Sequence, residues 1–208
     1  MRHLLAVFAL LATPAFAVTV DRIAATVDRQ VLTVSEITQM VEIRFFARTA
    51  ETEEDYRRDV LDALIAQALR FRDVERFGAQ DISADVIEAR LLDIQRRFPN
   101  EAEFLAAVAR SELTLDEVRA LVKRQLQVEA YIQERFAPLV FISNEEIDAY
   151  YRGTWSQQRR ERGLSIPPLS SVQDEIRTAV RGSRLEEETG KWTAQLRERA
   201  DVDVYAWR

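Results

Sequence analysis

Residues 20–40 read VDRIAATVDRQVLTVSEITQM, and the spacing of their hydrophobic residues changes along this stretch. Ile23, Ala25 and Val27 alternate with polar or small residues, and a second β-rich run, VLTV, follows the residues DRQ. This pattern predicts a strand, a tight turn and a second strand. Ser35 is then expected to be the N-cap of a first helix.

A single hairpin is only marginally stable in water, so this one needs a third strand or a helix to cover it. The other strongly strand-like run, VDVYAW, lies at the far end of the chain, at 202–207. We therefore expect the two ends of the chain to meet in a small β-sheet. Because the sequence between them has helical character, the predicted fold is mainly α, with a sheet formed by the N-terminal hairpin and the C-terminal strand.

The composition is typical of a globular protein with much exposed helix. The 208 residues are 47% hydrophobic and 31% charged, with only five glycines and five prolines. The formal net charge of -6 disfavours nucleic acid and anionic membranes as main partners, because neither finds a basic surface to bind.

Residues 1–17 have the features of a secretory signal peptide. A basic start at Arg2 precedes a short apolar run, and the small residues AFA end at Ala17. We expect cleavage after Ala17 and secretion across a membrane. An uncleaved anchor or a buried N-terminal helix is the alternative, and the apolar run is short for a membrane span.

Cleavage at this point would leave the chain with few side chains suited to catalysis or metal binding. The chain has no cysteine, and its one histidine, His3, lies in the expected signal. Thiol catalysis, Ser-His nucleophile pairs and ordinary zinc sites are therefore not expected, and no phosphate-binding loop is present. We predict no catalytic residues, no cofactor and no metal site.

Helix boundaries are signalled along the middle of the chain. Hydrophobic residues cover most of the circumference of a long helix that ends before Gly78, which predicts a helix surrounded by others. Four later helices are expected to begin after the N-cap residues Ser83, Asn100, Thr114 and Ser143.

The last part of the chain divides into a linker and a helix. Residues 152–171 lack periodicity and predict a mobile linker. The helix expected over 172–200 carries Ile176 and Val180 on one face and Trp192 and Leu196 on nearly the opposite face. Either this helix bends near Gly182, or it is buried on different sides at its two ends.

This order of elements resembles the SurA-type periplasmic chaperones. The stretches that carry the resemblance are VDRIAATVDRQVLTVSEI at 20–37, DVLDALIAQALRFRDVERFGAQDISADVIEARLLDI at 59–94, LTLDEVRALVKRQLQVEAYI at 113–132 and VQDEIRTAVRGSRLEEETGKWTAQLRERADVDV at 172–204. In that family an N-terminal helical region and a C-terminal helix and strand fold together as one core, and parvulin-type prolyl isomerase domains lie between them.

The chain departs from the family pattern at the insertion point of those domains. Only the linker at 152–171 stands there, and a further domain would need about 100 residues. The resemblance therefore implies a helical chaperone core over 18–151, completed by a helix and strand over 172–208, without the isomerase. It also implies a continuous C-terminal helix.

A chaperone of this kind needs an apolar, adaptable surface for unfolded segments. Phe46 on the first helix, Leu92, Tyr131 and, in the linker, Trp155 lie off the predicted core stripes and are candidates for client binding. For each, ordinary packing or isolated exposure is the alternative. The acidic runs, among them 51–55 and 186–188, are expected to be helix starts or solvated faces.

The expected function is ATP-independent holding of unfolded proteins in the periplasm, and the resemblance implies outer-membrane β-barrel precursors as clients. An alternative is a non-enzymatic scaffold subunit that uses the same apolar surface for one folded partner in an envelope complex. A prolyl isomerase is a second, disfavoured alternative. The sequence leaves open which clients bind, where the client groove lies, whether the chain dimerises, and whether a separate protein supplies an isomerase.

Overall fold

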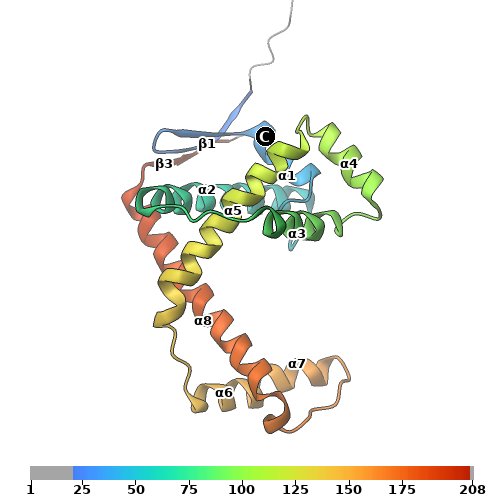
Figure 1. Cartoon of the computed structure of the whole chain (residues 1–208), viewed down its shortest axis with the longest axis vertical. Helices are drawn as coiled ribbons and strands as arrows, with labels where there is room; N and C mark the ends of the chain where they lie inside the picture. Colours follow the sequence, from blue (N-terminus) through green and yellow to red (C-terminus); the bar gives the residue numbers. More distant parts are fainter. Residues whose placement is uncertain (1–20, 207–208) are drawn as a thin grey trace, which may run out of the picture.

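A computed structural model describes residues 21–206, and the fold is mainly helical with one small antiparallel sheet (Figure 1). The expected signal peptide and its cleavage site lie outside these residues. The elements are β1 (Ile23–Val27), β2 (Gln30–Thr33), α1 (Val34–Glu42), α2 (Glu53–Phe77), α3 (Ala84–Gln95), α4 (Glu101–Arg110), α5 (Leu115–Phe136), the 3-10 turn η1 (Ala137–Leu139), α6 (Asn144–Tyr150), the π-helix η2 (Tyr151–Trp155), α7 (Ser156–Glu161), α8 (Leu169–Arg199) and β3 (Val202–Val204).

The sheet joins the two ends of the described chain, as expected. Its strand order is β2-β1-β3, and both pairings are antiparallel. Asp28, at the hairpin turn, holds the residue that precedes β3. Its backbone N–H donates to the Asp201 carbonyl at 2.7 Å, and its carboxylate accepts from the Asp201 N–H at 3.0 Å. The hairpin thus receives the third strand that it needs for stability.

The first strand does not follow the expected alternation of hydrophobic residues on one face, because Ile23 does not share the buried face of Ala25 and Val27. The pairing of Ile23 with Thr33 and of Ala25 with Leu32 leaves Ala24 as an extra residue, which is a β-bulge. The bulge places both Ala24 and Ala25 in the core and leaves Ile23 exposed.

Most helix starts lie where the sequence placed them. Asn100, Thr114 and Ser143 are N-caps whose side chains accept a backbone N–H three residues on, and Ser83 is an N-cap without such a bond. Ser35 is not the N-cap of α1. Thr33 holds that position in a capping box with Glu36, because β2 runs directly into the helix.

The main lobe consists of the sheet, α1 to α5 and the C-terminal half of α8, packed around α2. This 25-residue helix contacts α1, α5, α8 and both hairpin strands. Its buried residues Val60, Ile65, Leu69 and Val74 lie at helical spacing and are almost inaccessible. The wide apolar surface of α2 is thereby covered on several sides, as expected for a central helix.

A small lobe is formed by α6, η2, α7 and the N-terminal half of α8. Its separate core consists of Ile147, Trp155, Ile176 and Val180. The expectation of a mobile linker over 152–171 is therefore wrong for most of that range, since η2 and α7 cover residues 151–161 and α8 begins at Leu169, which leaves only 162–168 outside a helix. The helices there are too short to leave a readable period in the sequence.

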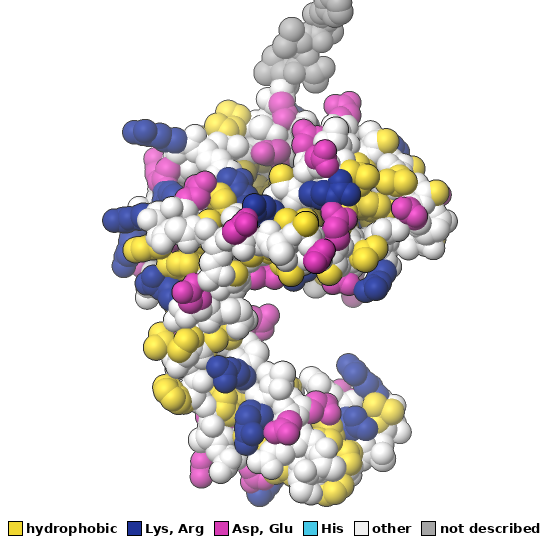
Figure 2. All heavy atoms as spheres, viewed as in Figure 1, with side chains coloured by type: hydrophobic (Ala, Val, Ile, Leu, Met, Phe, Trp, Pro, Cys, Tyr) yellow, Lys and Arg dark blue, Asp and Glu magenta, His cyan; other side chains and the backbone are white. Residues whose placement is uncertain are grey.

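Helix α8 is continuous and joins the two lobes. Its 31 residues span about 46 Å. Ile176 and Val180 belong to the small lobe, whereas Trp192 and Leu196 belong to the main core. Burial on different sides at the two ends is thus confirmed. On one side of α8 an open notch separates the lobes (Figure 2).

Candidate functional site

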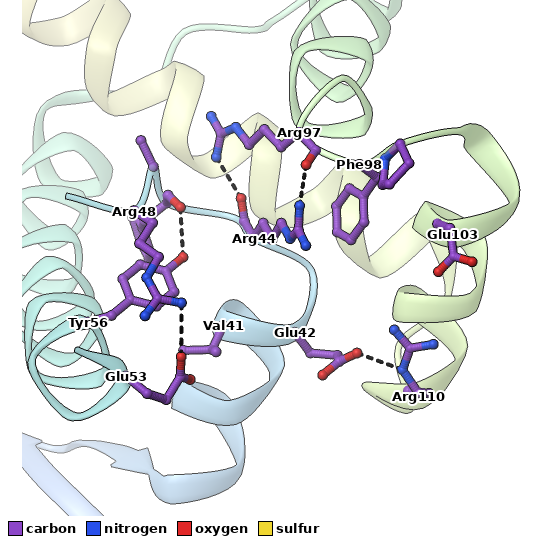
Figure 3. Close-up of a pocket in the computed structure, with 13 residues that line it drawn as sticks. Val41, Glu42, Arg44, Arg48, Glu53, Tyr56, Arg97, Phe98, Glu103 and Arg110 are labelled. Atoms are coloured by element: carbon purple, nitrogen blue, oxygen red, sulfur yellow. Dashed lines mark hydrogen bonds and ion pairs between the residues drawn. The ribbon is translucent and has the colours of Figure 1, made fainter. Parts of the chain in front are cut away.

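A pocket of about 730 Å³ opens on the main lobe between the end of α1, the start of α2, the end of α3 and α4 (Figure 3). We call it the arginine–aromatic pocket. It is lined by Val41, Glu42, Arg44, Phe46, Ala47, Arg48, Glu53, Tyr56, Arg97, Phe98, Pro99, Glu103 and Arg110.

The end of α1 creates one wall of this pocket. After the C-cap Ile43, Arg44 adopts a left-handed backbone conformation with φ of +50°. The Arg44 N–H donates to the Val41 carbonyl at 3.1 Å and the Phe45 N–H to the Met40 carbonyl at 2.9 Å, which is a Schellman motif. The chain therefore leaves the helix before Phe46, which lies in the following loop and not on the first helix as expected.

Tyr56 supports this loop from α2. Its ring is buried, and its hydroxyl donates to the Phe46 carbonyl at 2.8 Å. Burial raises the pKa of Tyr56, so the hydroxyl stays neutral and remains a donor. The half-buried Phe46 side chain is held between the pocket and the ring of buried Phe45, 5.2 Å away edge to face.

Arg44 and Arg97 bind the loop to the end of α3. The Arg97 guanidinium donates to the carbonyls of Arg44 and Phe45 at 2.6 and 2.7 Å, and the Arg44 guanidinium donates in return to the Arg97 carbonyl. Arg44 also lies over the ring of Phe98, 4.6 Å from its centroid. These two arginines are therefore part of the wall itself.

Two further arginines stand on the rim in exposed ion pairs. Arg48 pairs with Glu53 at 3.1 Å and lies 5.3 Å from the centroid of the Tyr56 ring. Arg110 pairs with Glu42 at 2.7 Å across the gap between α4 and α1. The lining thus combines apolar and aromatic side chains with charged ones, which suits a peptide segment that offers one large apolar side chain beside polar groups.

The four side chains predicted for client binding do not come together. Phe46 lines the pocket. Leu92 lies on α3 with 49% of its surface exposed and is not among the lining residues. The other two are buried: Tyr131 is 9% exposed and Trp155 is 7% exposed.

Tyr131 is packed in the main core, which is the alternative that the sequence left open for it. It contacts Trp192 of α8, with ring centroids 5.5 Å apart, and the ring of Phe77, with centroids 6.4 Å apart. Helix α5 is packed on two sides, and the sequence of α5 alone does not reveal the contribution of α8. Trp155 is likewise a core residue of the small lobe, where its indole N–H donates to Glu175 at 3.0 Å.

Sequence reasoning missed the aromatic and basic residues that build the pocket with Phe46. Tyr56 and Phe98 were not singled out, because each could equally be a core residue of its own helix. Arg44 and Arg97 carried no signal, since their role depends on a contact between positions 53 residues apart. The sequence FP at 98–99 was the nearest indication, because a proline commonly follows the end of a helix.

Other apolar side chains are exposed away from the pocket. Phe141 is 85%, Leu139 67% and Phe77 60% exposed. The first two lie in the connection between α5 and α6, where hydrophobic side chains gather beside α8 at the waist of the molecule (Figure 2). They offer further contacts for an extended chain.

Two features bear on metal binding and membrane insertion. Across residues 21–206, no group of three or more histidine, cysteine, aspartate or glutamate side chains is placed to hold a metal ion. In the same part of the chain, no helix combines the length and hydrophobicity that crossing a bilayer requires.

Three curated relatives, each named Chaperone SurA, match most of this chain. Identity is 27% over 197 residues with the protein of Pseudomonas putida, 28% over 161 residues with that of Chromobacterium violaceum, and 26% over 151 residues with that of Saccharophagus degradans. The matches cover 89%, 74% and 70% of this chain but only 45%, 38% and 35% of the relatives. The chain thus spans less than half the length of the relatives, and no family model matches it. Over most of its own length, the chain is therefore similar in sequence to chaperones named SurA.

Proposed function

We propose that this protein binds unfolded polypeptide segments without ATP and keeps them from aggregating. The observation that carries the proposal is the similarity to chaperones named SurA along 70–89% of the chain. We further propose that it acts in the periplasm, after cleavage behind Ala17, and that its clients are outer-membrane β-barrel precursors. We also propose that the N-terminal helical region and the C-terminal helix and strand act together as one chaperone core.

The pocket geometry supports weak, reversible binding. An aromatic side chain buries about 150–250 Å², which corresponds to a gross gain of about 4–6 kcal/mol. A micromolar complex needs about 8 kcal/mol after the costs of association. One aromatic residue in the arginine–aromatic pocket is therefore insufficient, and a client would have to engage several surfaces at once.

The exposed side chains of Leu92, Leu139 and Phe141 supply such additional contacts. Because they lie on different elements, an extended chain could reach several of them only while it is unfolded. Each weak contact raises the effective concentration of the client at the next one. Holding a client in this way lowers the concentration of free, aggregation-prone chain.

We propose no enzymatic role for this chain. Most acidic and basic residues of the pocket, among them Glu42, Glu53 and Arg97, are engaged in ion pairs or backbone hydrogen bonds, and the lining gives no nucleophile–base pair. A proline-peptide assay at high protein concentration should give no rate above background. A rate that scales with protein concentration would instead favour the isomerase alternative.

The proposal is tested by dilution of a urea-unfolded porin into buffer with and without residues 18–208, followed by light scattering. We expect suppression of scattering at near-stoichiometric ratios. Phe46→Ser and Leu92→Ser should each weaken suppression, whereas Val31→Thr, at an exposed site on β2, should leave it unchanged. Circular dichroism melting curves would establish that each variant is folded.

Absence of suppression by the folded wild-type protein would contradict the chaperone proposal. Capture of one folded envelope protein at a fixed stoichiometry would then support the scaffold alternative. Broad but weak binding of many unfolded chains would support the chaperone.

A further inference from the structure

The charge of the arginine–aromatic pocket differs in sign from that of the whole chain. Its thirteen lining residues, all within the described range, include Arg44, Arg48, Arg97 and Arg110 against Glu42, Glu53 and Glu103. Four positive and three negative charges leave a local excess of one positive charge, whereas the chain carries -6. A negatively charged group is therefore less disfavoured in this pocket than the net charge of the whole molecule would suggest.

The four arginines differ in how firmly they are held. Arg97 donates two hydrogen bonds to backbone carbonyls, and Arg44 donates one and lies over Phe98, so both are fixed in the wall. Arg48 and Arg110 stand at the rim, with side chains 48% and 58% exposed, and they pair with carboxylates of the protein itself. Arg48 also donates to the backbone carbonyls of Ala50 and Glu51 at 3.2 and 3.4 Å, so Arg110 is the less restrained of the two.

The rim ion pairs can exchange partners at small cost. Exposed ion pairs stabilise a protein by about 0–1 kcal/mol, so replacement of Glu42 or Glu53 by an incoming carboxylate loses little. A guanidinium offers a planar fork of donors that matches a carboxylate, and Arg110 already uses its Nε on Glu42 at 2.7 Å.

The aromatic part of the pocket lies beside these arginines. Phe46, Tyr56 and Phe98 line it, and guanidinium groups already lie over the rings of Tyr56 and Phe98. An incoming aromatic ring would find both ring edges and guanidinium faces to pack against. A ligand that offers a ring and a carboxylate in neighbouring positions would use both features together.

We propose that the arginine–aromatic pocket selects segments of unfolded polypeptide in which an aromatic residue stands next to an aspartate or glutamate. The inference rests on the proposed function and adds a preference to it. In the bound state the ring lies in the apolar interior, and the carboxylate displaces Glu42 from Arg110 or Glu53 from Arg48.

The test uses two blocked hexapeptides, acetyl-Ser-Gly-Phe-Asp-Gly-Ser-amide and the same peptide with Asn in place of Asp. Each is titrated into the ¹⁵N-labelled protein at low salt, and the Kd is obtained from shifts of the backbone amides, which also locate the site. We expect the Asp peptide to bind about twofold more tightly, which corresponds to about 0.4 kcal/mol, because the new ion pair replaces an exposed pair of similar strength and only the local excess of positive charge favours it. High salt should reduce this ratio toward one, because the rim is exposed.

Three variants test whether the preference for the Asp peptide comes from the pocket or from the overall charge of the protein. The double change Arg48→Gln and Arg110→Gln should abolish the preference. Glu42→Gln, which removes the internal competitor for Arg110, should strengthen binding of the Asp peptide about twofold. Arg177→Gln on α8, which removes an arginine of similar exposure from a surface ion pair, should change nothing.

The outcomes distinguish this inference from the proposed function. Equal Kd values for the two peptides on the wild-type protein would overturn the preference, even if porin aggregation is suppressed. A preference that survives loss of both rim arginines, or shifts that map elsewhere, would overturn its location. Failure of the porin assay would remove the chaperone function, whatever the peptides do.

Discussion

At the scale of single residues, two helices end without the glycine that usually permits the turn. Arg44 after α1 and Glu112 after α4 both have positive φ, +50° and +59°, and each is followed by a buried or half-buried apolar residue, Phe45 or Leu113. Both ends have the hydrogen bonds of a Schellman motif. The apolar contact and the bonds of Arg44 to α3 offset the conformational cost at that position.

The capping residue of α1 can be tested at the same scale. Thr33→Ala should lower the free energy of unfolding by about 1 kcal/mol, because it removes the side-chain acceptor of the Glu36 N–H. Ser35→Ala is the matched control, since Ser35 lies inside the helix, and we expect a smaller effect. Urea unfolding of the two variants measures the difference, and a larger loss for Ser35→Ala would contradict the assignment of Thr33.

How much a residue's role shows in the sequence depends on where its partners lie. The N-caps Asn100, Thr114 and Ser143 were predicted correctly, because their bonds reach only three residues along the chain. For Tyr131 the sequence left two roles open, because its main contact, Trp192, is 61 positions away. For the same reason only Phe46 of the pocket was identified.

At the scale of elements, α8 has to remain helical in the section that connects the two lobes. Gly182 lies in this exposed middle section, and a Cβ added there meets nothing within 4 Å. Gly182→Ala should therefore raise the free energy of unfolding by about 0.5–1 kcal/mol, through higher helix propensity.

Gly78 provides the contrast to Gly182. It also has free space for a Cβ, but it ends α2 with φ of +101°. Gly78→Ala should destabilise the protein by about 1–3 kcal/mol because of backbone strain. Thermal unfolding of both variants checks the pair, and destabilisation by Gly182→Ala would indicate that the helix needs to bend there.

The elements could be predicted from the sequence wherever a cap and a long apolar stripe coincide. This applies to the end of α2, the start of α5 and both ends of α8, which lie within a few residues of those expected. It fails over 152–171, because a five-residue π-helix and a six-residue α-helix have no full amphipathic period. Their position is determined by burial of Trp155 against α8, which is a tertiary contact.

At the scale of the whole molecule, the two lobes differ greatly in the size of their cores. The small lobe buries Ile147, Trp155, Ile176 and Val180, whereas the main core includes residues from the sheet and from five helices besides α8. Local stability follows buried apolar contacts. We therefore expect amides of α6 and α7 to exchange with deuterium faster than those of α2 and α5.

Trp155→Ala should lower the stability of the small lobe and leave that of the main lobe unchanged. Loss of a buried tryptophan costs about 3–5 kcal/mol, which is large for so small a core. Exchange should rise throughout α6 and α7 and stay unchanged in α2. Trp192→Ala is the control, since it contacts Tyr131 and Phe136 in the main lobe and should increase exchange in α5. Equal effects of Trp155→Ala on both lobes would show that the molecule unfolds as one unit.

The central claim is that this chain holds unfolded polypeptides and that the arginine–aromatic pocket is one place where it holds them. The most direct measurement puts a photo-crosslinking phenylalanine derivative at position 46 and, as a control, at position 177 on the exposed face of α8. Each protein is irradiated with a urea-diluted porin and, separately, with the same porin already folded. The account predicts a crosslink from position 46 to the unfolded porin, little from position 177, and none from position 46 to the folded porin. Equal crosslinking from both positions, or crosslinking to the folded porin alone, would contradict it.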